Sequence, residues 1–180
     1  LILSDLMLHA SNNLKSSLEK IHALLKPDGL MLCSMFGSET LRELRSCLLA
    51  AEEQFKEKVY PRIHPFTDIR TAGDILQGSG FKLCVADDTT IKVPTKDVYQ
   101  LVKLIRSMGE NNYLNTDKPN ISRNIWNKTS ELMKDVTPTE DGVMSTFQIL
   151  TLTGWKYHAD QPKPLKPGSA KISLADFFDK

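Results

Sequence analysis

The chain has 180 residues, of which 41 % are apolar, and carries 23 Lys plus Arg against 22 Asp plus Glu. This composition suits one medium globular domain and excludes disordered and fibrous classes. A net charge of +1 offers no attraction for nucleic acid or an anionic membrane, and no apolar run approaches the roughly 20 residues that cross a bilayer. We therefore expect a soluble intracellular protein without a nucleic-acid partner or a transmembrane segment.

The first elements predict a strand–helix–strand unit. Residues 1–8 form a near-continuous apolar run, typical of a strand that is covered on both faces. Apolar residues recur at helical spacing over 13–26, after Asn12 or Asn13 as N-cap, and residues 30–36 form a second buried strand. Because a buried strand needs neighbours and none precedes residue 1, we expect the chain to begin inside a fold.

The later elements continue this alternation. In chain order we predict a helix over 38–58 capped by Ser38, a helix over 68–77, a strand over 81–86 with a short one at 90–93, helices over 95–108 and 122–136, a strand over 145–155 and an extended tail over 161–180. Alternating helices and strands predict an α/β fold with a mostly parallel sheet and helices on both faces.

Two loops follow the first two strands, where open α/β sheets bind ligands. The polar residues of these loops are His9, Ser11, Asn12 and Asn13 in the first, and Gly37, Ser38 and Thr40 in the second. They could line a pocket together. Helix capping is the better explanation for Asn12, Asn13 and Ser38, whereas His9 is not explained so easily.

The remaining reactive residues allow two interpretations each. Cys33, Cys47 and Cys84 lie among apolar neighbours, which favours inert core thiols over a nucleophile. The pair His158 and Asp160 has the spacing of a two-histidine, one-carboxylate iron site. Its third ligand would come from another histidine; the candidates are His9, His22 and His64.

Two further features are ambiguous as well. Arg42 and Arg45 lie three residues apart on one predicted helix, where they could reach an anion at the sheet end or form a solvated stripe with neighbouring glutamates. Residues 108–112 could be a lid over a substrate or an ordinary helix C-cap.

Several motifs resemble a known family. The blocks S-D-L-M-L-H at 4–9, L-K-P-D-G-L-M-L at 25–32 and F-G-S-E-T-L-R-E-L-R at 36–45 resemble the second half of a class I S-adenosylmethionine-dependent methyltransferase. The blocks P-R-I-H-P-F-T at 61–67, M-G-E-N-N at 108–112, L-T-G-W-K-Y-H at 152–158 and K-P-G-S-A at 166–170 are similar to the mitochondrial complex I assembly methyltransferase-like (arginine hydroxylase) family and its alphaproteobacterial relatives. Malonyl-carrier-protein methyltransferases are a more distant resemblance.

This resemblance implies a partial Rossmann-like fold. Residues 1–160 would be the carboxy-terminal part of a methyltransferase-like domain, with its fourth to seventh strands and a helical insertion over 95–140, and 161–180 would be the tail. The glycine-rich turn and the acidic ribose-binding residue of the family would lie in an absent amino-terminal half, so that the S-adenosylmethionine site would be incomplete.

The resemblance also implies roles for single residues. On the cofactor side it places Ser4, Leu6, His9, Phe36 and Gly37, and on the substrate side Arg45, Glu110 and Asn111. Catalytic residues remain unassigned and no metal ligand is implied. Ala10 stands where relatives usually carry Trp, which would open the mouth of the pocket.

We therefore expect an S-adenosylmethionine-dependent methyltransferase-like protein that acts on a protein or carrier-bound substrate related to complex I assembly. As this chain alone it would be inactive. The alternatives are a protein arginine hydroxylase and a non-catalytic assembly module. Its partners would be a complex I subunit or the amino-terminal half, and its location the bacterial cytoplasm or, in a eukaryote, the mitochondrial matrix side.

Overall fold

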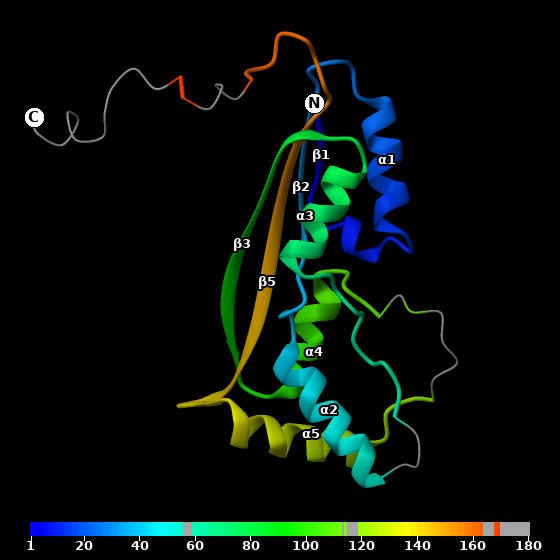
Figure 1. Ribbon diagram of the computed structural model, residues 1–180. Helices are drawn as coiled ribbons and strands as arrows, with labels where there is room; N and C mark the ends of the chain where they lie inside the picture. The colour runs from blue at the N-terminus through cyan, green and yellow to red at the C-terminus, as the bar shows by residue number, and fades with distance from the viewer. Residues whose placement is uncertain (56–58, 113, 115–118, 164–167, 170–180) are drawn as a thin grey trace, which may run out of the picture.

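A five-stranded sheet runs the length of the protein (Figure 1). The computed structural model describes residues 1–55, 59–112, 114, 119–163 and 168–169. In chain order the elements are β1 (Ile2–Ser4), the 3-10 turn η1 (Leu8–Ala10), α1 (Leu14–Leu24), β2 (Leu30–Phe36), α2 (Arg42–Phe55), α3 (Ile69–Gly78), β3 (Lys82–Thr95), α4 (Val98–Ser107), α5 (Arg123–Val136), β4 (Pro138–Thr139) and β5 (Gly142–Trp155). The α/β class is confirmed.

The sheet order is β1-β2-β5-β3, and β4 pairs with β5. β1 and β2 are parallel, as the strand–helix–strand unit requires, but β5 runs antiparallel to β2, β3 and β4. The prediction of a mostly parallel sheet is wrong for these strands. β2 and β3 point the same way, since each runs antiparallel to β5. β5, however, turns back from β4 and enters between them, so that among these pairings only that of β1 with β2 is parallel. Its partnership over 14 residues also makes β3 one strand instead of two short ones.

Side-chain caps fix where four helices begin. The caps are Asn13 for α1 through Ser16 N at 2.9 Å, Asp68 for α3 through Thr71 N at 2.9 Å, Asp97 for α4 through Gln100 N at 2.8 Å and Ser122 for α5 through Ile125 N at 3.4 Å. The predicted cap Ser38 is wrong, because residues 37–41 form a turn in which Leu41 has a φ of 56°, and α2 starts at Arg42. The predicted end of this helix, at 56–58, lies outside the described residues.

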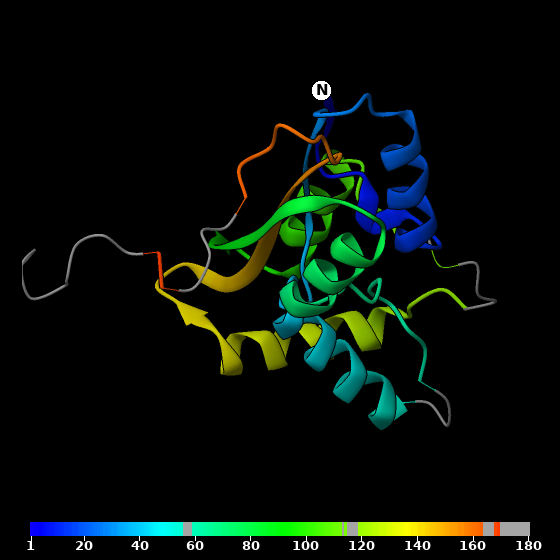
Figure 2. The same cartoon turned by 45° about the horizontal axis from the view of Figure 1, so that its top comes forward.

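α1 and α3 cover one face of the sheet (Figures 1 and 2). Beneath them lies an apolar core, here the α1/α3 cluster, composed of Leu18, Leu25, Met31, Cys33, Met35, Ala72, Leu76, Phe81, Leu150 and Leu152. Alternation along β2 sends every second side chain into this core. Each fully buried Leu, Met or Phe side chain in this cluster stabilises the fold by about 1.5–3 kcal/mol.

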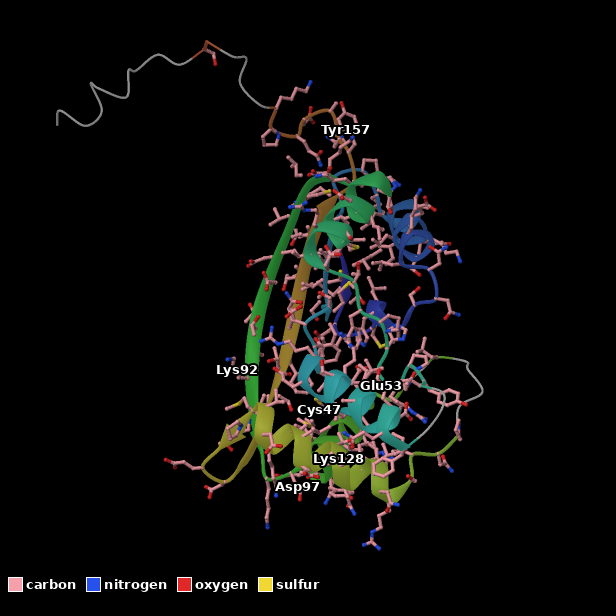
Figure 3. All side chains as sticks on the ribbon, turned by 60° about the horizontal axis from the view of Figure 1, so that its bottom comes forward. Cys47, Glu53, Lys92, Asp97, Lys128 and Tyr157 are labelled. Atoms are coloured by element: carbon pink, nitrogen blue, oxygen red, sulfur yellow. The ribbon has the colours of Figure 1, made fainter. Side chains whose placement is uncertain are left out.

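α2, α4 and α5 cover the opposite face at the other end of the sheet. They bury the pocket cluster, which consists of Phe36, Leu41, Leu44, Cys47, Leu48, Ala51, Val98, Leu101, Ile125, Met133, Val143 and Phe147. Figure 3 shows Cys47 within this layer and Lys92 projecting from β3 on the far side. The two clusters therefore stabilise different ends of the sheet from different faces.

An apolar row crosses the sheet on the face of the pocket cluster, beyond the reach of its helices. The row joins Leu3, Leu32, Thr153 and Val85 through consecutive strand pairings. Leu3 is 66 % exposed, Leu32 39 % and Val85 58 %. The prediction that residues 1–8 form a strand buried on both faces is thus wrong: β1 has three residues, and only its α1/α3 side is covered.

The helical insertion predicted before the last strand corresponds to α4, α5 and the short β4, which lie between β3 and β5 in sequence. None of the described helices is both long and apolar enough to span a lipid bilayer. Most of the predicted tail over 161–180 lies outside the described residues.

Candidate functional site

The carboxyl ends of β1 and β2 meet beside the pocket cluster. β1 ends at Ser4 and β2 at Phe36, and because these strands are parallel their ends lie at the same edge of the sheet. The two predicted loops do come together there, since His9 Nδ1 lies 3.4 Å from Phe36 N. This edge is where an open α/β sheet offers space for a ligand.

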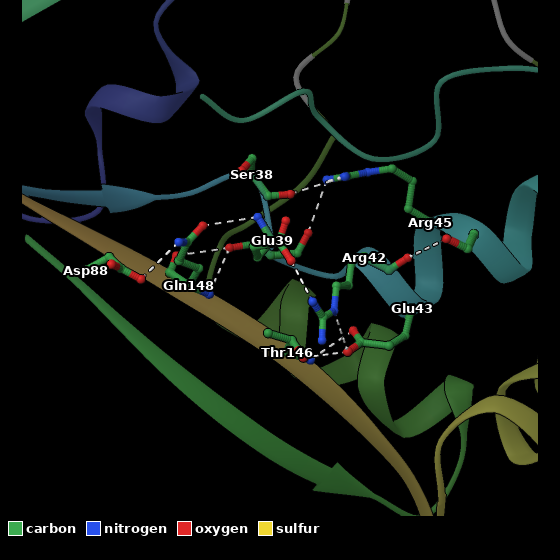
Figure 4. A network of polar contacts seen from close by, with 10 residues as sticks. Ser38, Glu39, Arg42, Glu43, Arg45, Asp88, Thr146 and Gln148 are labelled. Atoms are coloured by element: carbon green, nitrogen blue, oxygen red, sulfur yellow. Dashed lines mark hydrogen bonds and ion pairs between the residues drawn. The ribbon is translucent and has the colours of Figure 1, made fainter. Parts of the chain in front are cut away.

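A polar network fastens the turn after β2 to β5 (Figure 4). The side chain of Gln148 accepts a hydrogen bond from Glu39 N at 3.1 Å and donates to Asp88 Oδ2 at 3.0 Å. Thr40 Oγ1 donates to the Gln148 carbonyl at 3.0 Å. A Cβ on Gly37 would overlap the Gln148 side chain. Close packing on this network explains why glycine occupies position 37.

Arg45 holds the same turn from α2. Its guanidinium donates to the carbonyl oxygens of Ser38 at 3.2 Å and Thr40 at 3.1 Å (Figure 4). It lines a second hollow against the loop that carries Val59 to Phe66, and not the main pocket described below. Arg45, which was predicted on the substrate side, therefore stabilises the turn after β2 and does not line the main pocket.

Arg42 belongs to a solvated ion-pair group. Its guanidinium contacts Glu39 at 2.6 Å and Glu43 at 3.3 Å, and the hydrogen bond that it donates to the Glu39 carboxylate is the main reason that the pKa of Arg42 is raised. Burial tends to raise the pKa of Glu43, but hydrogen bonds from Thr146 and Arg42 outweigh it and lower this pKa. The interpretation of a charged stripe is confirmed for Arg42.

His9 occupies a gap in the β-ladder. Because β1 ends at Ser4, the N–H of Phe36 has no strand residue beside it, and His9 Nδ1 accepts its hydrogen bond. The ring lies against Phe36, at 4.9 Å between centroids, and Phe66, at 5.6 Å. Its other nitrogen, Nε2, lies 3.0 Å from Glu110 Oε2. The His9 side chain is 1 % exposed, so both nitrogens are engaged inside the protein.

The end of α4 aims Glu110 at His9. Gly109 has a φ of 81° and donates from its N–H to Arg106 O, while Glu110 N donates to Ile105 O, both at 3.1 Å. These two bonds form a Schellman motif, in which a left-handed glycine ends the helix and redirects the chain. The helix predicted to end at residue 108 ends at Ser107, and the cap carries Glu110 and Asn111 to the pocket.

A cavity of about 210 Å³ lies between the strand ends and the inserted helices. Its lining is mostly apolar and includes Phe36, Leu48, Ile105, Ile121, Trp126 and Phe147. Its polar residues are His9, Thr40, Arg62, His64, Arg106, Glu110, Asn111 and Asn112. A chamber of this kind suits a ligand with an apolar body and a polar end.

A buried ion pair holds the wall of the cavity. Arg62 donates through Nη2 and Nε to Glu52 Oε1, at 2.6 and 2.9 Å, and through Nη1 to the carbonyl of Pro119 at 2.7 Å. Glu52 is fully buried and also accepts from Tyr60 N at 3.0 Å. Asn112 donates to Arg62 O at 2.7 Å. This group joins α2 to two loops that line the cavity.

His64 lies in the same wall. Its ring is 5.6 Å from that of Phe66, and its buried Nδ1 has no hydrogen-bond partner among the described residues. Burial is the main cause that lowers the pKa of His64. The imidazole is therefore neutral at physiological pH and can bind a ligand through hydrogen bonds.

The five residues predicted on the cofactor side lie together at the strand ends, but in two layers. Ser4 and Leu6 are half-buried, whereas His9, Phe36 and Gly37 are buried by contacts within this chain. Leu6 has a φ of 45° and packs against the pocket cluster. Ser4 and Leu6 are thus the more accessible members, whereas His9 and Phe36 line the cavity described above.

The other predicted reactive groups do not line the cavity. Burial raises the pKa of Cys33 to about 11 and is also the main cause that raises the pKa of Cys47 and Cys84, which supports inert thiols. His158 contacts Asp160 at 3.5 Å, with both side chains well exposed. In the part of the chain that the structure describes, no three His, Cys, Asp or Glu side chains gather in a geometry that could hold a metal ion.

Sequence reasoning missed Arg62 and Gln148, named His64 only as a possible iron ligand, and included Asn112 only within the ambiguous segment 108–112. Arg62 lies in the motif at 61–67, which was noted only for its resemblance to a family. The Pro-bounded block at 61–67, in which Arg and His precede an aromatic residue, was the available signal. Gln148 lies inside an ordinary strand pattern, which gives no sign of a structural role.

Comparison with known proteins gives clear sequence relatives. The chain is 36 % identical over 177 residues to arginine-hydroxylase NDUFAF5, mitochondrial, of Homo sapiens, covering 98 % of this chain and 51 % of that protein. The protein of that name in Dictyostelium discoideum is 36 % identical over 178 residues, covering 98 % and 41 %. The malonyl-[acyl-carrier protein] O-methyltransferase of Nitrosospira multiformis is 27 % identical over 157 residues, covering 87 % and 49 %. The chain spans about half the length of the curated relatives it matches.

Two further comparisons are weaker. No family model matches the chain. Among solved structures, the YcgJ protein of Bacillus subtilis aligns with a TM-score of 0.46 and 12 % identity, over 88 % of this chain and 64 % of that one. The sequence relatives therefore carry the assignment, and they confirm the resemblance found in the motifs.

Proposed function

We propose that this chain, which is similar to the NDUFAF5 arginine hydroxylases and to malonyl-carrier-protein methyltransferases, belongs to the class I S-adenosylmethionine-dependent methyltransferase superfamily and acts as the carboxy-terminal part of such an enzyme. The observation that carries this proposal is the similarity along 98 % of the chain. Its substrate would be a protein or a carrier-bound group connected with complex I assembly, in the mitochondrial matrix or the bacterial cytoplasm.

Methyl transfer needs one surface for the cofactor and another for the acceptor, and the site offers both. Ser4 and Leu6 offer a wall for S-adenosylmethionine at the end of β1, and the cavity beyond Phe36 offers a dry, largely apolar chamber for the acceptor. When bound, the cofactor supplies an activated methyl group on a sulfonium. The chain's own contribution is to orient the acceptor and to exclude water, and both accelerate a displacement reaction.

Methyl transfer is balanced without a further reagent. The acceptor forms a bond to the methyl carbon as the bond from carbon to sulfur breaks, and the acceptor's proton passes to solvent or to a neutral base. His64 is the neutral imidazole that faces this chamber. We assign it as the candidate proton acceptor.

Arginine hydroxylation is the second candidate, because the relatives' name states it and because the cavity has groups that suit a guanidinium. Glu110 offers a carboxylate, His64 a neutral acceptor, and Phe36 an aromatic wall. Arg62 does not oppose a cation there, because Glu52 neutralises it at 2.6 Å. This reaction would need molecular oxygen as oxidant and a two-electron reductant.

A two-part experiment tests the proposal. Calorimetry measures S-adenosylmethionine binding to this chain alone and to this chain mixed with the amino-terminal half of the human relative. We expect binding only by the mixture, and loss of binding in Ser4→Arg but not in Thr90→Arg, an exposed position on β3. Mass spectrometry of an arginine-containing peptide then distinguishes an added methyl group from an added oxygen.

The outcomes separate the hypotheses. Size-exclusion chromatography shows whether the two halves associate. If they associate and still bind no S-adenosylmethionine, the enzyme proposal fails and a non-catalytic assembly module becomes the better description. An added oxygen would select hydroxylation. If this chain alone binds S-adenosylmethionine, the expectation that binding needs the amino-terminal half is wrong.

A further inference from the structure

His9 was expected to face the cofactor, but its surroundings assign it a different task. The side chain is 1 % exposed, with Phe36 on one side and Phe66 on the other. A ring so enclosed has little surface for a ligand. Its two nitrogens instead contact groups that lie 27 residues further along the chain, at Phe36, and 101 residues further, at Glu110.

The backbone fixes which nitrogen carries the proton. Phe36 N–H is a donor and points at His9 Nδ1, so this nitrogen must present its lone pair. In the neutral ring the hydrogen then resides on Nε2, which faces Glu110 Oε2 at 3.0 Å and donates to it. The cause is the early end of β1, which leaves the Phe36 N–H for a side chain to satisfy.

Glu110 receives this hydrogen bond at a fixed place. The Schellman motif at Gly109 sets the path of the backbone, and the side chain is 17 % exposed. Within the described chain no hydrogen bond to its second oxygen, Oε1, is found. Glu110 lines the cavity, so a carboxylate anchored through one oxygen offers the other to a ligand.

We propose that His9 is a positioning residue: held as the Nε2–H tautomer by the end of β2, it fixes the carboxylate of Glu110 at the cavity and so couples the strand ends to the inserted helix α4. This rests on the proposed function in that the cavity is taken as the acceptor side of the site. His9 then serves as a fixed hydrogen-bond donor to Glu110, because its Nδ1 is engaged by the Phe36 N–H.

Two substitutions divide the two contacts of His9. The amide of Gln in His9→Gln reaches the position of Nε2 and keeps a donor for Glu110. The shorter Asn in His9→Asn reaches the position of Nδ1 and keeps only an acceptor for Phe36 N–H. His158→Asn is the matched control, since this exposed histidine also contacts a carboxylate, that of Asp160, at 3.5 Å.

The experiment is nitrogen-15 NMR on the full 180-residue chain without ligand, so that it is independent of whether the chain is an enzyme. Long-range proton–nitrogen spectra at pH 8 report the tautomer of His9, and hydrogen exchange reports the amide of Glu110, which donates to Ile105 O. Protection of the Leu152 amide in β5 verifies that each variant is folded.

We expect an unprotonated Nδ1 and a protonated Nε2 in the natural protein. Exchange at Glu110 should rise about tenfold or more in His9→Asn, as for the loss of a hydrogen bond to a charged group, and stay within about threefold in His9→Gln and in the control. A proton on Nδ1, or equal exchange in the Asn and Gln variants, overturns the proposal. If the variants unfold, the tautomer of the natural protein still decides it.

Discussion

The two clusters on opposite faces of the sheet are held by different kinds of interaction. The α1/α3 cluster is apolar throughout, and its helices close directly over it. The pocket cluster surrounds a cavity, and polar contacts hold its walls: Glu52 with Arg62, His9 with Glu110, and Gln148 with the turn after β2. Packing alone suffices where the core is filled, whereas a hollow region needs directional bonds to keep its shape.

The largest test of this comparison breaks the buried ion pair. Glu52→Gln removes the charge that balances Arg62, whose side chain is 8 % exposed beside a fully buried partner. An uncompensated buried charge costs about 3–5 kcal/mol of the free energy of unfolding. Urea denaturation monitored by circular dichroism measures it.

Glu19→Gln on α1 is the control, because Glu19 pairs with Lys15 at 3.9 Å with both side chains more than half exposed. The expected change there is within about 0.5 kcal/mol. If both variants lose the same free energy of unfolding, polar contacts are no more important on the pocket side than on α1.

A smaller effect is expected from two glycines. Gly37→Ala would press a methyl group into the Gln148 side chain, and overpacking of this kind costs about 1–3 kcal/mol. Gly78→Ala at the end of α3 meets nothing within 4 Å and should stabilise the protein by about 0.4–1 kcal/mol. Thermal melting compares the two.

Adding Gln148→Ala to Gly37→Ala relieves the overlap, so the double variant should lose less stability than the sum of the single variants. Strict additivity would mean that the turn does not depend on Gln148.

The smallest effect is a pH dependence that both clusters share. Burial lowers the pKa of His22, with a contribution from the charge of Lys156, and burial also lowers that of His64. The unfolded chain then binds more protons than the folded one, so stability is complete above the ordinary pKa of 6.5 and falls as the pH drops below it. His22→Leu should reduce this slope between pH 7 and 5, measured by urea denaturation at each pH.

His64→Leu, in the wall of the cavity, should also reduce the slope of stability against pH, independently of His22→Leu. A slope that survives both substitutions unchanged would place the titration elsewhere in the molecule.

Local patterns predicted the elements well. The strand over 30–36 has the predicted bounds, and the helix predicted over 122–136 differs by one residue, because apolar periodicity and a serine cap mark such segments within their own sequence. The direction of β5 was not predictable in this way, since β-branched residues favour a strand without saying which neighbours it pairs with or how.

The site shows the same limit. His9 was singled out because it follows a strand, but its contact with Glu110 spans 101 residues and depends on how α4 packs. The pair of Glu52 and Arg62 was missed, although only ten residues separate them, because a helix and a loop bring them together in three dimensions. Sequence spacing identifies candidates at strand ends, and tertiary packing decides which of them a ligand can reach.

The central position of β5 has a consequence for how the protein forms. β2 and β3 are not neighbours until β5 joins both, and its pairings with β2 connect residues more than 110 positions apart. A ribosome must therefore release Trp155 before the sheet can close, and the earlier strands wait with unpaired edges. Closing so large a loop is slow, so we expect folding in the range of milliseconds to seconds. The unit of β1, α1 and β2, whose two strands pair in parallel without β5, is the part that can assemble first.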